Sequence, residues 1–154
     1  MPGRTLPAPV PGLVIGYSYL WDESYLWDED FRAGREEGSK DRPCAVVIAS
    51  RTEDGDLVVT VAAVTHRPPD DPDDAVELPA QVKRSLGLDD ARSWLVCREL
   101  NRFVWPGPDL RPVARSRPGQ FVHGRLPGTF MQRVFDRLHA LRRARRLRAV
   151  MRSP

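Results

Sequence analysis

Four side chains in the first half of the chain have the types that phosphate chemistry requires. Arg42 precedes Pro43 and an apolar run, so its guanidinium is expected in a fixed position at the mouth of a buried strand. The planar fork of a guanidinium matches phosphate oxygens. Thr65 ends another strand-like run and could donate one hydrogen bond, while Glu37 and His66 are the candidate bases.

Each of these residues also has a structural interpretation. Glu37 could form a salt bridge to Arg42 or Lys40. Arg42 could belong to a buried ion pair that orders its loop, and His66 could be a loop histidine beside Arg67. The residue types alone leave both interpretations open.

Short strands must position these residues. Alternation of apolar and polar side chains, apolar runs and turn residues predict strands and one short helix. Asp54-Gly55 predicts a hairpin turn, because glycine supplies the positive φ that tight turns require. In the first strand, four alternating apolar residues share one face: Leu13, Ile15, Tyr17 and Tyr19. The predicted strands are 12–19, 44–49, 57–65, 75–78, 93–98 and 102–105, and the short helix is 79–86.

The clearest helix is the last element. Apolar residues follow helical spacing from Thr129 to Met151, with Thr129 as a plausible N-cap and arginines on the other face. We therefore expect three parts: a flexible arm over 1–11, a β domain over 12–124, and a basic amphipathic helix over 125–154 that docks on the barrel. The pattern indicates a small antiparallel β-barrel or twisted sheet with a terminal helix.

The charge of this 154-residue chain is divided unevenly. Its net charge is +3, but residues 125–154 hold nine arginines and one aspartate, and 1–124 hold 15 basic and 20 acidic groups. An acidic body with a basic tail suggests an electrostatic partner, such as RNA or an acidic peptide, or a solvated helix face. No apolar run could cross a membrane. Cys44 and Cys97 lie in apolar runs, which predicts buried, reduced thiols in a cytoplasmic protein and no metal site.

A six-residue duplication stands out between the first two strands. The sequence SYLWDE at 18–23 is repeated at 24–29. It is too short to be a repeat architecture, so we interpret it as a lengthened surface loop. Alternatively it forms an aromatic and acidic lip, in which Trp27 could stack on an unpaired base.

Three segments in a fixed order carry a resemblance to a known family. They are EGSKDRP at 37–43, VAAVTH at 61–66, and GL at 87–88 followed by SWLV at 93–96. This order resembles the PemK/MazF family of bacterial toxin–antitoxin ribonucleases. The segment WPGPDLRP at 105–112 and the basic C-terminal segment depart from the usual pattern, as in a divergent branch.

The resemblance implies an SH3-like antiparallel β-barrel that forms a homodimer. It implies cleavage of single-stranded RNA without a metal ion or other cofactor, and inhibition by an antitoxin with an acidic, disordered tail. Arg42 and Thr65 match the active-site positions and Glu37 a nearby loop position. The expected catalytic set is thus Arg42, Thr65, Glu37 and His66, with Lys40, Arg67 and Trp27 contacting RNA.

Two other functions remain as alternatives. The family's further acid is not clearly present, since Arg98 occupies its expected place and Glu99 lies one step on. This favours a non-catalytic barrel that binds nucleic acid or a protein target, as a relative of the fold inhibits DNA gyrase. The atypical segment 105–112 leaves a housekeeping barrel as a third possibility.

Overall fold

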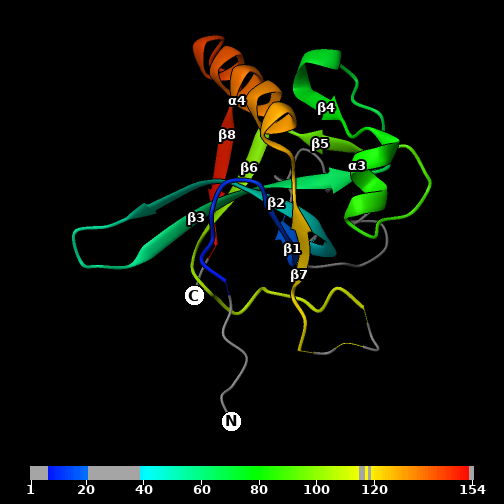
Figure 1. Ribbon diagram of the computed structural model, residues 1–154. Coiled ribbons are helices and arrows are strands. Elements are labelled where there is room, and N and C mark those ends of the chain that lie inside the picture. The colour runs from blue at the N-terminus through cyan, green and yellow to red at the C-terminus, as the bar shows by residue number, and fades with distance from the viewer. Residues whose placement is uncertain (1–6, 21–38, 115–116, 118, 153–154) are drawn as a thin grey trace.

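The computed structural model describes residues 7–20, 39–114, 117 and 119–152 (Figure 1). This part contains eight strands, two α-helices and one 3-10 helix. Their bounds are β1 Leu13–Leu20, β2 Ser39–Arg51, β3 Leu57–Thr65, the 3-10 helix Pro72–Asp74, β4 Ala75–Glu77, α3 Ala80–Ser85, β5 Trp94–Val96, β6 Glu99–Val104, β7 Val122–Arg125, α4 Gly128–Arg143 and β8 Arg148–Met151.

The eight strands form one curled sheet. Its order is β4-β5-β3-β2-β1-β7, and β6 pairs with both β3 and β8. The long strand β3 pairs with β6 through its first half and with β5 at its end, so two short strands share one of its edges. Except for the parallel β6–β8 pair, the strand pairs of the described residues are antiparallel. The expected fold class is therefore confirmed: mainly β, a small barrel-like antiparallel sheet with a short helix and a C-terminal α-helix.

The first strand is buried on both faces. The predicted alternation is confirmed, because Leu13, Ile15, Tyr17 and Tyr19 lie in one apolar cluster with residues of β2, β3 and β6. The other face of β1 presents Val14 to a second cluster that α3 and α4 complete. Gly16 lies where the chain after β6 crosses β1, and a Cβ there would be 2.2 Å from the Arg111 carbonyl oxygen. Only glycine permits this close approach of two backbones.

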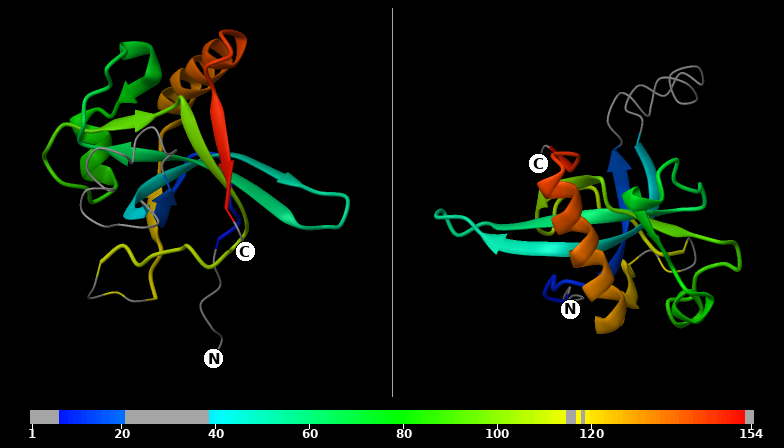
Figure 2. Two further views of the ribbon diagram at one scale, coloured as in Figure 1. Left: turned by 180° about the vertical axis from the view of Figure 1, so that it is seen from behind. Right: turned by 90° about the horizontal axis from the view of Figure 1, so that it is seen from above.

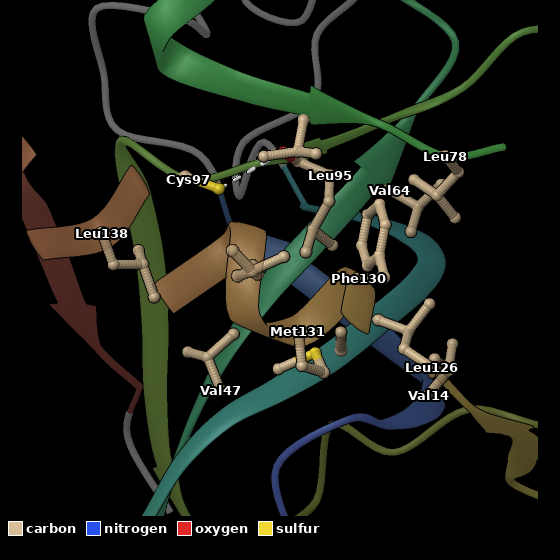
Figure 3. Packing of buried hydrophobic residues seen from close by; sticks show 14 of the residues in the cluster. Val14, Val47, Val64, Leu78, Leu95, Cys97, Leu126, Phe130, Met131 and Leu138 are labelled. Atoms are coloured by element: carbon tan, nitrogen blue, oxygen red, sulfur yellow. Dashed lines mark hydrogen bonds between the residues drawn. The ribbon is translucent and has the colours of Figure 1, made fainter. Parts of the chain in front are cut away.

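Helix α4 packs one apolar stripe onto the sheet. Phe130, Met131 and Leu138 point from the helix towards strand residues such as Val47 and Leu95 (Figure 3). The predicted helical stripe is thus confirmed as far as Leu141. The predicted cap is wrong: the helix begins after Pro127, and no side chain caps it. Proline at this position sets the backbone angle without a side-chain hydrogen bond.

The basic segment is not one helix to its end. Helix α4 ends at Arg143, and Arg148–Met151 form β8, which runs parallel to β6 (Figure 2). Arg145 adopts a φ of 58°, and the Arg146 amide donates to the Leu141 carbonyl at 2.9 Å. This six-to-one bond is the Schellman ending of a helix, here with arginine where glycine is usual. The expectation of a helix through residue 151 is therefore wrong.

Other elements also differ from expectation: β5 is shorter than the predicted strand 93–98, and β6 begins at Glu99 and not at residue 102. Strand β2 begins at Ser39, so Arg42 lies within the strand and not at its mouth. Strand β7 was not predicted from the sequence and pairs with β1. Neither α3 nor α4 is long and apolar enough to cross a membrane, and no other α-helix occurs among the described residues.

Candidate functional site

Two of the predicted residues meet where β2 and β3 run side by side. Cys44 and Ala63 form the last pair of the β2–β3 ladder, and Arg42 and Thr65 each lie two residues beyond that pair. The Arg42 Nη1 atom donates to the Val64 carbonyl at 3.5 Å. Because side chains alternate along a strand, Arg42 and Thr65 extend on the same face of the sheet. The hairpin therefore brings a guanidinium and a hydroxyl to one end of β3.

Aromatic and apolar side chains of β1 and β2 pack beside Arg42. Tyr17 lies opposite Arg42 in β1, and Tyr19 and Cys44 are fully buried beside it. Burial raises the pKa of the Cys44 thiol and of the Tyr19 hydroxyl well above their usual values, while Arg42 acts in the opposite direction. Cys44 is therefore a neutral thiol that packs beneath the guanidinium, and it is no nucleophile.

The chain after Thr65 turns away from β2. The Thr65 hydroxyl accepts the Arg67 amide at 3.2 Å, which leaves its own hydrogen free to donate. The His66 Nε2 atom lies 2.8 Å from Asp89 Oδ2 and 3.1 Å from Asp89 Oδ1. His66 and Arg67 are exposed. The imidazole thus leans towards the loop between α3 and β5, on the far side of β3 from Arg42.

Asp89 belongs to this region and was not among the residues predicted from the sequence. Its Oδ1 atom accepts Lys83 Nζ at 2.6 Å and the Ala91 amide at 3.1 Å. The pKa of Asp89 is lowered, chiefly by the hydrogen bond from Lys83 and also by His66. The Lys83 side chain is only 5% exposed. A buried lysine needs a charged partner, and Asp89 supplies it.

The remaining predicted residues are placed only in part. Glu37 and Trp27 lie outside the described residues, as do the Lys40 side chain and the duplicated sequence after Leu20. Glu99, the alternative position for the family acid, is buried in β6. Its backbone carbonyl accepts the Tyr19 hydroxyl at 2.7 Å.

A second polar cluster fastens the end of the described chain to β1. Arg152 Nη1 donates to the Ser18 carbonyl at 2.5 Å, and Nη2 lies 3.3 Å from Asp109 Oδ1. Asn101 accepts the Leu20 amide and donates to the Leu20 carbonyl, both at 2.9 Å. These bonds satisfy buried polar groups, so we assign them a structural role.

Two arginines of the basic C-terminal segment bond to other parts of the protein. Arg137 donates to the Pro72 and Ala75 carbonyls, and Arg146 pairs with Asp71 and Asp74. Three arginines at the end of α4 remain exposed, and these are Arg142, Arg143 and Arg145. The surface charge of this end is therefore smaller than the sequence suggests, but still basic.

The described residues contain no cluster of three or more side chains arranged to hold a metal ion. Comparison with known proteins gave no relatives: no protein-family model, no curated protein and no solved structure matches the chain.

Proposed function

We propose that the protein is an endoribonuclease that cleaves single-stranded RNA without a metal ion, as the toxin of a toxin–antitoxin pair. The observation that carries the proposal is the convergence of β2 and β3. It brings the Arg42 guanidinium to the Val64 carbonyl, next to Thr65, and His66 follows on the side of the loop between α3 and β5. The order of sequence segments that resembles PemK/MazF proteins supports the same reaction.

The proposed reaction uses the substrate's own 2′-hydroxyl as nucleophile. A base removes the proton of this hydroxyl, and the 2′-oxygen attacks the adjacent phosphorus. The bond to the 5′-oxygen then breaks, the leaving oxygen takes a proton, and a 2′,3′-cyclic phosphate remains. Arg42 would stabilise the charge on the pentacoordinate phosphate, and the Thr65 hydroxyl would donate to a phosphate oxygen. His66 and Glu37 are the candidate bases.

The test is cleavage of a fluorescent single-stranded RNA in the presence of a chelator. The Arg42→Ala variant is expected to lower kcat by about 10²-fold or more. Arg42→Lys should restore only part of the rate, because an ammonium lacks the planar fork. Arg51→Ala is the matched control, since Arg51 is an exposed arginine at the other end of β2. Equal cleavage by Arg42→Ala and the wild type would refute the site.

The resemblance extends the proposal to partners. We propose a homodimer inhibited by an antitoxin with an acidic tail, which the exposed arginines Arg142, Arg143 and Arg145 could contact. Sedimentation would give the oligomeric state. Binding to the product of a small neighbouring reading frame, weakened by salt and by charge reversal at Arg142 and Arg143, would test the partner.

A non-catalytic role is the second candidate. Helix α4 packs on the face of the sheet opposite to that of Arg42. The exposed arginines at its end therefore form a basic surface separate from the Arg42 site, and this separation favours the non-catalytic role. Such a barrel would bind nucleic acid or a protein target without cleaving RNA. This role predicts that the wild type does not cleave RNA but binds it in a salt-sensitive way. Arg142→Ala should weaken the binding, and Arg42→Ala should not.

A further inference from the structure

A buried lysine, an aspartate and an exposed histidine form a connected chain beside the end of β3. The Lys83 side chain is 5% exposed, whereas His66 is 61% exposed. Lys83 Nζ donates to Asp89 Oδ1 at 2.6 Å and also to the Ala91 carbonyl. The lysine is thus fixed in the interior by α3 and the loop that follows it.

The Asp89 carboxylate is held by three donors from three parts of the chain. They are the Lys83 ammonium at 2.6 Å, the Ala91 amide at 3.1 Å and the imidazole of His66 at 2.8 Å. A carboxylate with two such anchors has a defined orientation. Among the described residues, its Oδ2 atom then contacts His66.

The contact with Asp89 also sets which ring nitrogen of His66 carries the hydrogen. An ionised carboxylate only accepts hydrogen bonds, so His66 Nε2 must be the protonated nitrogen. In a neutral ring Nδ1 then carries the lone pair, and no bond to Nδ1 occurs among the described residues. This is the arrangement by which an aspartate fixes the tautomer of a catalytic base.

We infer that Asp89, anchored by Lys83, is a positioning residue that holds His66 with Nδ1 as the proton acceptor for the 2′-hydroxyl of RNA. The inference rests on the proposed ribonuclease function and chooses His66 over Glu37 as the base. His66 directly follows Thr65, and Arg42 reaches the carbonyl of the residue before Thr65. The guanidinium reaches the end of β3 from β2, and the imidazole lies on the side of the loop between α3 and β5, so the RNA is placed across this strand end, between the two side chains.

The first test compares Asp89→Asn with Asp90→Asn, a matched change at the next, exposed residue. Asparagine can donate to Nε2, which moves the hydrogen to Nδ1 and blocks the base. For Asp89→Asn we expect kcat to fall by about 10²–10⁴-fold with KM within about twofold. Asp90→Asn should cleave as the wild type does. Nitrogen-15 shifts of the imidazole should report hydrogen on Nε2 in the wild type and on Nδ1 in Asp89→Asn.

The second test is a double-mutant comparison. His66→Ala removes an exposed ring without disturbing Lys83 and is expected to lose about 10²–10⁴-fold in kcat. Adding Asp89→Asn to it should cause no further loss, because Asp89 acts only through His66. A merely structural aspartate would instead lower activity equally in both backgrounds.

The outcomes separate the inference from the function on which it rests. If the wild type cleaves RNA and His66→Ala or Asp89→Asn keeps full kcat, the inference is overturned and the ribonuclease proposal stands. Hydrogen on Nδ1 in the wild type would overturn it as well. If the wild type leaves RNA uncut, the proposed function fails, and the assignment of His66 as base fails with it.

Discussion

Arg146 Nη2 lies 2.6 Å from Asp74 Oδ1, so the turn after α4 is fastened to the 3-10 helix that precedes β4. Asp74 is buried, and its other cation, Arg98, is more distant at 3.8 Å. We predict that Arg146→Ala lowers the free energy of unfolding by about 1–3 kcal/mol at neutral pH, because a buried carboxylate loses its closest donor. Denaturant unfolding measures this change, and Arg143→Ala at an exposed position is the control.

The same pair predicts a dependence on pH. Burial raises the pKa of Asp74, and Arg146 partly opposes this rise, so the alanine variant raises the pKa further. A carboxyl with a raised pKa destabilises the fold when it is ionised, and protonation at acid pH relieves this cost. The loss caused by Arg146→Ala should therefore shrink as the pH is lowered from 7 towards and below the raised pKa. A loss that grows in acid would contradict the assignment.

The left-handed residue at the end of α4 predicts a stabilising substitution. Arg145 holds a φ of 58°, which costs an L-residue about 1 kcal/mol. Arg145→Gly is therefore expected to raise the free energy of unfolding by about 0.5–1 kcal/mol. Arg143→Gly removes the same side chain inside the helix and should lower it by about the same amount. Thermal melting distinguishes the expected gain in stability of Arg145→Gly from the expected loss in Arg143→Gly.

Thr129 and Phe130 are adjacent but should respond very differently to alanine. Phe130 is buried against the sheet, so Phe130→Ala is expected to cost about 3–5 kcal/mol. Thr129 is exposed and caps nothing, so Thr129→Ala should change stability by less than about 0.5 kcal/mol. A loss near 1 kcal/mol for Thr129→Ala would instead indicate a side-chain cap.

The two cysteines should be inert in the folded protein. Burial raises the pKa of Cys97 to about 12 and that of Cys44 further above its usual value. Thiolates are the reactive form, so neither should react with a disulfide reagent at pH 8 until the protein unfolds. The absorbance of the coloured thiol that the reagent releases measures the extent of reaction, and the protein unfolded in denaturant is the positive control. Rapid labelling of one thiol in native buffer would contradict the burial.

The hairpin could be predicted from the sequence, because local chemistry determines it. The Asp54-Gly55 turn sets the register of β2 and β3 near Arg51 and Leu57, and β3 spans Leu57–Thr65 as expected. The approach of Arg42 to the end of β3 could not be predicted in the same way, because an irregularity between Val46 and Ile48 shifts the register by one residue. Asp89 could not be predicted, because 23 residues separate it from His66 and only the folding of α3 and β5 onto β3 brings them together.

The last strand shows that the spacing of apolar residues does not predict where a helix ends. Ala144, Leu147 and Met151 continue the helical spacing of α4, yet the helix stops at Arg143. No glycine or proline marks the break, since arginine takes the left-handed position. Pairing of Arg148–Met151 with β6 overrides the local preference, and such long-range pairing is invisible in a single sequence.

The hydrogen bonds around the end of β1 join residues that are far apart in the sequence, and this affects the folding rate. Tyr19 bonds to a residue 80 positions away, Leu20 to one 81 positions away, and Arg152 to one 134 positions away. Closing such long loops comes before any gain from the contacts they create. Folding is therefore expected to take about milliseconds to seconds, in the range of other sheets built from distant contacts, although each hairpin and helix forms far sooner.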